Sequence, residues 1–148
     1  MANGFALQPV LDLEQRRLEL ATTQLQKLGG QRREAEAKLR QLQSSQAQYR
    51  ASRQRGLAQG MEPDRLRDFD VFLAKLEHAI ALQTAEVERA QQAWETEHRH
   101  WLALRAREQA LGVLARRHAA TLARREARNE QKQQDEFAAM KVRQAKEG

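Results

Sequence analysis

The sequence predicts an all-α protein, a long antiparallel two-helix coiled-coil hairpin with a C-terminal helical overhang. Ala, Glu, Lys, Leu and Arg supply 85 of the 148 residues, a composition typical of coiled coils and long helices. The residues that favour strands (Val, Ile, Thr, Tyr, Phe and Trp) number only 18, which argues against a sandwich, a barrel or a doubly wound sheet.

The helix boundaries follow from the few residues that interrupt helices. Pro9 and Pro63 each precede strongly helical sequence, where the missing N–H of a first-turn proline costs nothing. The run from Gly56 to Pro63 is the one clear break. We expect a single coiled-coil domain with a first helix over about residues 9–54, a tip at 55–63, a second helix over about 64–138 and a frayed tail at 139–148.

Heptads run through both predicted helices. In the first helix, nine of the twelve a and d positions are Leu, Ala or Tyr, and in the second Leu73, Ile80, Val87, Trp94 and Trp101 stand seven residues apart. This spacing keeps one seam facing a partner helix. Because the connection is short, the two helices are expected to pair antiparallel.

Pairing about the predicted tip places residue 50 near residue 66 and residue 9 near about 107. The second helix from about residue 111 onward then has no partner within the chain, and its apolar Leu111, Leu114, Leu122 and Phe137 favour coverage by another protein. A frayed tail is the open alternative. Gly29 and Gly30 interrupt the first helix and favour a close-packing point or a tolerated weak spot over a hinge.

No group of residues with the spacing of a catalytic or metal site is found. Cysteine is absent, and Gly29-Gly30 lacks the Lys-Ser/Thr continuation of a phosphate-binding loop. His98 and His100 diverge by roughly 160° on a helix, and the acidic pairs lie on exposed helix. We therefore expect no enzyme, no metal and no cofactor. The absence of a long apolar run or a signal-like N-terminus predicts a soluble cytoplasmic protein.

Basic residues are concentrated at the two ends of the predicted hairpin. Residues 38–67 carry a net charge of +5 and residues 111–148 carry +4, whereas residues 73–110 carry −1. Two separate patches with interleaved acidic residues fit protein partners at each end better than a nucleic acid, which needs a continuous basic stripe or stacking aromatics. Ordinary solvated helix faces remain open as an explanation.

Apolar residues crowd around the predicted tip. Because a two-helix pair has only one seam, Phe69, Phe72, Leu73 and Leu76 cannot all face it. Some of them must be exposed together with Tyr49, and an exposed apolar patch on a soluble protein usually marks a contact site.

Several of these residues resemble the FliJ family, the small coiled-coil component of the flagellar type III export apparatus. The resemblance rests on Tyr49-Arg50 before the tip, Gly60 in the bend and Trp101, and it covers most of the chain. It also includes Phe72 followed by Leu76-Glu77-x-Ala79-Ile80, and the run Arg128-x-x-Gln131-Lys132-x-x-Asp135-Glu136-Phe137-Ala138.

The resemblance implies a non-enzymatic stalk that is similar to the central stalk of rotary ATPases. Such a protein binds the hexameric flagellar export ATPase with its open end and promotes ATP hydrolysis. Its tip binds the cytoplasmic domain of the large membrane export-gate subunit, and it also binds export chaperones. These properties predict a cytoplasmic protein that serves flagellar assembly and motility, is a monomer when free, associates peripherally with the inner-membrane gate at the flagellar base and binds no nucleic acid.

The resemblance also assigns residues. The positions that match the family's gate-binding residues are Leu42, Tyr49, Phe72, Leu76 and Ala79. Lys38, Ser45 and Gln83 stand where the family pattern has Gln, Tyr and His, which predicts a retuned interface. The candidates for the ATPase ring, together with the start of the first helix, are Arg116, Arg117, Arg124, Arg125, Arg128, Gln131 and Lys132.

Three alternatives stay open at this point. The first is the equivalent stalk of an injectisome. The second is a basic coiled coil that binds nucleic acid or an acidic membrane, with binding that falls steeply with salt. The third is a homodimeric structural coiled coil in which the overhangs pair with each other.

Overall fold

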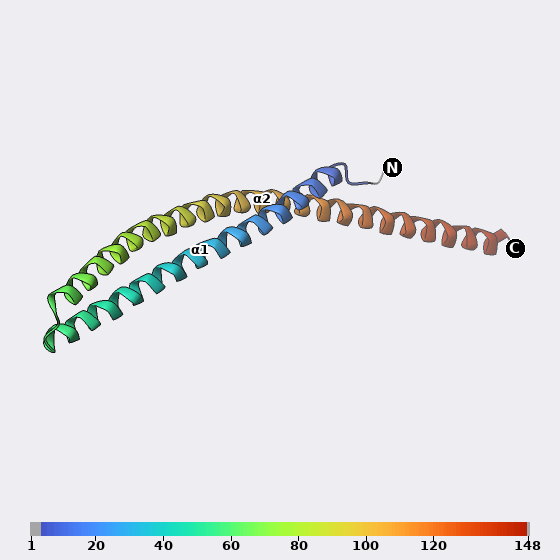
Figure 1. The fold of residues 1–148 in the computed structure, drawn as a ribbon. Helices are drawn as coiled ribbons and strands as arrows, with labels where there is room; N and C mark the ends of the chain where they lie inside the picture. Colours follow the sequence, from blue (N-terminus) through green and yellow to red (C-terminus); the bar gives the residue numbers. More distant parts are fainter. Residues whose placement is uncertain (1–3, 148) are drawn as a thin grey trace. The chain divides into compact units, whose positions relative to one another are not determined.

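Two long helices make up the fold. The structure is a computed structural model that describes residues 4–147. It contains α1 (Gln8–Ala58, 51 residues) and α2 (Pro63–Glu147, 85 residues), with no strand in that part of the chain. The helices run antiparallel and pack against each other as a hairpin (Figure 1). The predicted fold class is therefore confirmed.

The helix ends differ from the predicted ones. α1 continues to Ala58 rather than to about 54. The tip therefore consists of residues 59–62 and not of the predicted 55–63. Gly56 lies inside α1, and the Met61 side chain folds over it. A Cβ at position 56 would overlap the Met61 methyl group. Gly60 turns the chain with a φ of +84°, a conformation that favours glycine.

The C-terminal tail is also helical. Residues 139–147, predicted to fray, belong to α2, and Gly148 lies outside the described residues. The sequence holds no proline after Pro63 and no glycine between Gly112 and Gly148, so no strong helix breaker stands in this stretch.

The contacts divide the chain into two compact units. The tip unit is Glu19–Leu102, and the end unit joins the chain up to Leu18 with the chain from Ala103 onward. The tip unit buries Ala21, Ala35, Leu76 and Ala90 in its seam, all small or aliphatic. The end unit buries Leu11, Leu104 and the charged Glu14. The prediction of a single domain stays a prediction.

Side-chain contacts across the seam define the helix register. In the tip unit, Arg32 Nη1 donates to Gln91 Oε1 at 3.2 Å and Trp101 Nε1 donates to Thr22 Oγ1 at 2.8 Å. Residue 32 thus faces residue 91, one heptad away from the register in which residue 50 faces residue 66. The predicted pairing is wrong because an apolar pattern that repeats every seven residues fits both registers equally well.

The end unit shows the same displacement. Phe5 packs against His118, with ring centroids 5.7 Å apart, so the predicted pairing of residue 9 with about 107 is also wrong by about one heptad. The start of the chain covers α2 further towards the C-terminus than the sequence predicted.

Candidate interaction surfaces

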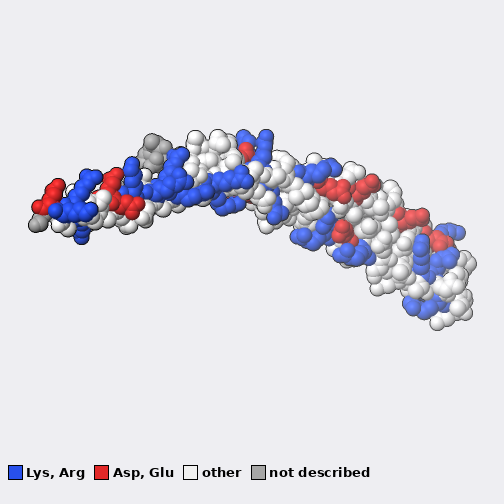
Figure 2. Space-filling view, turned by 180° about the vertical axis from the view of Figure 1, so that it is seen from behind, with Lys and Arg blue, Asp and Glu red and all other residues white. Residues whose placement is uncertain are grey.

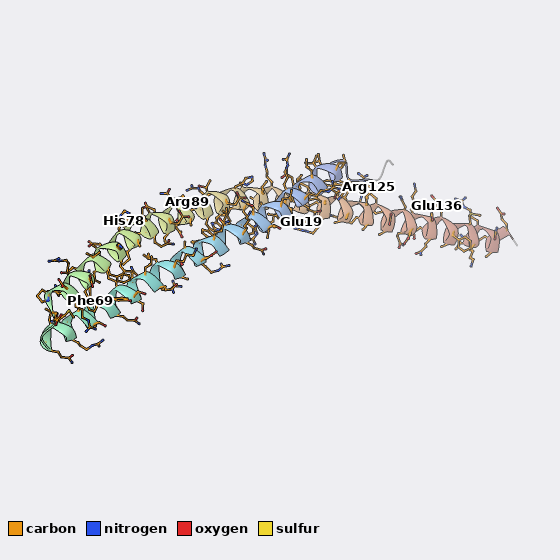
Figure 3. The ribbon with its side chains drawn as sticks, viewed as in Figure 1. Glu19, Phe69, His78, Arg89, Arg125 and Glu136 are labelled. Carbon is orange, nitrogen blue, oxygen red and sulfur yellow. The ribbon has the colours of Figure 1, made fainter. Side chains whose placement is uncertain are left out.

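An aromatic cluster stands at the end of the tip unit. The ring centroids of Tyr49 and Phe72 are 4.4 Å apart, and those of Tyr49 and Phe69 are 6.3 Å apart in an edge-on arrangement. Tyr49 is 41% exposed and Phe72 is 39% exposed, while Phe69 is half-buried close to the turn (Figure 3). We call Tyr49, Phe69 and Phe72 the tip patch. Beside the tip patch, an ion pair from Arg53 Nε to Asp70 Oδ1 at 2.8 Å joins α1 to α2.

The other predicted gate-binding residues lie in or beside the seam. Leu76 is buried at 8% exposure, and Leu42 and Ala79 are half-buried. The prediction that the apolar residues of this region cannot all face one seam is confirmed, because Phe72 is exposed whereas Leu76 is buried. Of the five predicted residues, Tyr49 and Phe72 offer the most exposed surface, while Leu76 packs behind them as core.

The three positions that depart from the family pattern have distinct surroundings. Gln83 Nε2 donates to the backbone oxygen of Ala35 at 3.0 Å, so it ties α2 to α1. Lys38 is exposed and pairs with Glu34 at 3.6 Å, and Ser45 is half-buried. Of these three, Gln83 therefore contributes to pairing of the helices in this chain.

The part of α2 without a partner helix begins later than predicted. Leu111, Val113, His118 and Leu122 are half-buried, whereas every residue from Ala123 to Glu147 is exposed. The prediction that α2 is unpaired from about residue 111 is wrong, because Phe5, which lies just before α1, packs on His118. We call residues 123–147 the unpaired segment, which continues alone past the start of α1 in Figure 1.

The predicted ATPase-binding residues are all exposed on the end unit. Figure 2 shows Lys and Arg side chains gathered along this part of α2, with Asp and Glu among them, and Figure 3 labels Arg125 there. At about 100° per residue, Arg117, Arg124 and Arg128 fall within roughly 40° of one another on one helix face. Arg116 and Arg125 lie on either side of that face.

These basic groups are available to a partner. In the described part of the end unit, none of the six predicted Arg and Lys residues forms an ion pair. Arg124 Nε donates only to the backbone oxygen of Ala120, at a long 3.4 Å. Gln131 Nε2 donates to Asp135 Oδ1 at 3.0 Å, which occupies its amide within the helix.

No group of three or more His, Asp and Glu side chains among residues 4–147 is placed to hold a metal ion. The hydrogen bond from Arg89 lowers the pKa of Glu86 and raises that of Arg89. These two residues lie one helical turn apart, with Arg89 exposed and Glu86 half-buried. No helix within residues 4–147 is long and apolar enough to cross a membrane.

Sequence reasoning missed one polar and aromatic cluster in the tip unit. The Arg32 guanidinium lies over the Trp94 ring, 4.5 Å from its centroid, and His98 stacks on Trp94 at 4.8 Å. A Cβ at Gly29 would lie 3.4 Å from Trp94 Nε1. The Gly29-Gly30 pair was the available signal. A Cβ at Gly29 would make ordinary van der Waals contact, so the choice between a close-packing point and a tolerated weak spot stays a prediction.

Comparisons with known proteins gave a match to one family model. The model described as "Flagellar FliJ protein" matches residues 3–147. No curated protein and no solved structure matches the chain.

Proposed function

The chain belongs to the FliJ family of flagellar export proteins, and from this premise we propose that it is the non-enzymatic stalk of the export apparatus. In this role it binds and stimulates the hexameric flagellar export ATPase, contacts the cytoplasmic domain of the large export-gate subunit and binds export chaperones. Its place is then at the cytoplasmic side of the inner membrane at the flagellar base.

The observation that carries the proposal is the exposed basic surface of α2, which begins at Arg116 and continues into the unpaired segment. The stretch from Arg116 to Lys132 carries six basic side chains without ion pairs in the described chain. Exposed charges of one sign steer an oppositely charged partner into place and add hydrogen bonds to it. An acidic lining of an ATPase ring is the complementary surface.

The tip patch supports the second contact. Tyr49 and Phe72 present adjoining aromatic surface that is only partly buried by the chain's own seam. Aromatic residues of this kind are the commonest anchors of protein interfaces. We assign this patch, with Leu42, Leu76 and Ala79 behind and beside it, to the gate.

No bond chemistry is required of the chain. A single asymmetric stalk cannot contact all six subunits of a ring in the same way. The subunit that is contacted has a different free energy of closure from its neighbours, and this difference biases the order of ATP hydrolysis. The match to a flagellar family model favours this system over the injectisome alternative.

The test is ATP hydrolysis by the cognate flagellar ATPase with and without the full chain. We expect stimulation, and we expect the variant Arg117→Gln/Arg124→Gln/Arg128→Gln to need roughly 100-fold more protein for it, because each lost charged contact is worth on the order of 1 kcal/mol. Rising salt is expected to weaken stimulation by the unchanged chain.

The matched control removes the same charge elsewhere. Arg33, Arg40 and Arg99 are exposed on the tip unit, and their replacement by Gln is expected to leave stimulation intact. Equal stimulation by both triple variants would contradict the ATPase assignment. Binding to DNA or to acidic vesicles without any effect on the ATPase would support the basic coiled-coil alternative instead.

A further inference from the structure

One apolar stripe of the tip unit does not by itself determine the register of the two helices. Leu73, Ile80, Val87, Trp94 and Trp101 repeat every seven residues on α2, and the apolar positions of α1 follow the same repeat. Sliding one helix by a heptad, about 10 Å, therefore returns the apolar residues of this stripe to apolar positions. Gly60 lies within the observed turn and Gly56 shortly before it, so the turn can also form nearer Gly56.

We propose that Gly29 and Arg32 of α1, with Gln91 and Trp94 of α2, form a register lock that selects one of these pairings. Three contacts meet at this point. The Trp94 indole packs on the backbone of Gly29, where a Cβ would lie 3.4 Å from Nε1. The Arg32 guanidinium lies over the same indole, 4.5 Å from its centroid. Arg32 Nη1 also donates to Gln91 Oε1 at 3.2 Å.

The side chains that form these contacts are held where water screens them only in part. Gly29 is buried, Trp94 and Gln91 are half-buried, and the Arg32 side chain is 25% exposed. A cationic group at a seam position loses part of its hydration on pairing. In the observed register the ring face of Trp94 and the amide oxygen of Gln91 replace part of that hydration, while Arg32 Nε has no hydrogen-bond partner.

A slip of one heptad towards the register predicted from the sequence breaks all three contacts. Val87 would then face Gly29 and leave the space of an indole unfilled. Gln91 would face Leu25 instead of Arg32, and Arg32 would face Thr84 instead of Gln91. The apolar stripe of Leu73, Ile80, Val87, Trp94 and Trp101 survives such a slip, whereas each contact of the register lock is lost.

A slip in the opposite direction is opposed in a different way. Trp101 would reach Gly29, but Trp94 would face Glu36, and the hydrogen bond from Trp101 to Thr22 at 2.8 Å would be lost. The glycine at position 29 and the two tryptophans together thus accept one register and disfavour both of its neighbours.

The experiment uses disulfide formation in the full chain, which has no native cysteine. Lys38 and Glu86 line the same surface hollow, so Lys38→Cys/Glu86→Cys reports the observed register. Lys38→Cys/Ala79→Cys and Lys38→Cys/Ala93→Cys report the two registers one heptad away. In the otherwise unchanged chain we expect the first pair to cross-link at least tenfold faster than the other two.

The lock is then broken in two ways. Gly29→Leu fills the site of the indole, and Trp94→Leu removes the indole itself. In both variants we expect the Lys38/Glu86 cross-link to slow at least tenfold and one of the two slipped pairs to form instead, while circular dichroism shows unchanged helix content. Gly30→Leu is the matched control, because a Cβ there has only the end of Arg33 nearby, at 3.9 Å.

The outcomes are distinct. Cross-linking of Lys38/Glu86 alone in both lock variants overturns the proposal, and so does loss of that cross-link without the appearance of a slipped pair. A slip in Gly30→Leu equal to that in Gly29→Leu also overturns it. These readouts are independent of the ATPase and the gate, so their result does not depend on the proposed function.

Discussion

At the scale of single residues, Glu14 is the clearest departure from an ordinary coiled-coil seam. Its side chain is only 7% exposed, and one carboxylate oxygen accepts from Arg17 Nη1 at 3.2 Å while Oε2 has no hydrogen-bond partner. Arg17 is half exposed, so its charge stabilises the carboxylate through partly solvated contact. The desolvation free energy of a buried carboxylate with one unpaired oxygen is larger than the stabilisation from its ion pair with the exposed Arg17.

The first prediction concerns this residue. Glu14→Leu is expected to raise the free energy of unfolding by about 1 to 3 kcal/mol, because an apolar side chain at this seam position removes the desolvation cost and adds burial. Urea denaturation followed by circular dichroism measures the change. Glu19→Leu, at an exposed position of α1, is the control and is expected to change stability by less than about 0.5 kcal/mol. A loss of stability in Glu14→Leu would contradict this account.

At the scale of elements, the two parts of α2 depend on different interactions. From Pro63 to Leu122, α2 contains buried and half-buried residues, whereas the unpaired segment is exposed throughout. Contacts one turn apart along this segment include Gln131 with Asp135 and the Lys141 ammonium 4.8 Å from the Phe137 ring centroid. Such contacts are worth only about 0.2–0.5 kcal/mol each. Because the unpaired segment is exposed throughout, these weak contacts are not supplemented by burial against α1.

The second prediction separates these parts by truncation. Ending the chain after Ala123 is expected to change the free energy of unfolding of the hairpin by less than about 0.5 kcal/mol, because it removes only exposed residues. Ending it after Leu111 removes His118, which packs on Phe5, and half-buried Leu122, so we expect a loss of roughly 1 to 3 kcal/mol.

Urea denaturation of the two truncated chains measures these changes. Hydrogen exchange of the full chain should be fastest over residues 123–147. Equal stability of the two truncated chains would show that the contacts between Phe5 and α2 contribute nothing. Both truncated chains are expected to lose ATPase stimulation, since both lack Arg124 and Arg128.

At the scale of the whole molecule, the two proposed contact surfaces belong to different compact units. The tip patch lies in the tip unit, and the unpaired segment lies in the end unit. No residue contributes to both. A change in one surface should therefore leave binding at the other unaltered, because residues without shared contacts behave independently.

The third prediction tests this separation. Tyr49→Ala/Phe72→Ala is expected to abolish gate binding and motility while leaving helix content and ATPase stimulation unchanged. The control is Val71→Ala/Leu82→Ala, which removes apolar side chains that are 51% and 61% exposed outside the tip patch. Pull-down with the cytoplasmic gate domain and a swimming assay measure the effects. Normal motility of the Tyr49/Phe72 variant would contradict the assignment of the tip patch.

The sequence determined the elements of this protein and the chemistry of their surfaces. Its helix-forming composition and heptads predicted two antiparallel helices, Gly56 to Pro63 placed the bend, and the basic stretch from Arg116 to Lys132 was exposed as expected. These features are local, since helix propensity and a seven-residue repeat can be read from one segment at a time.

Only the tertiary structure decided the register. Residue 32 faces residue 91, Leu76 is buried while Phe72 is exposed, and α2 is covered as far as Leu122. A pattern that repeats every seven residues is satisfied equally by pairings one heptad apart. The choice between them depends on contacts between side chains far apart in the sequence, such as Trp94 over Gly29, which no single segment contains.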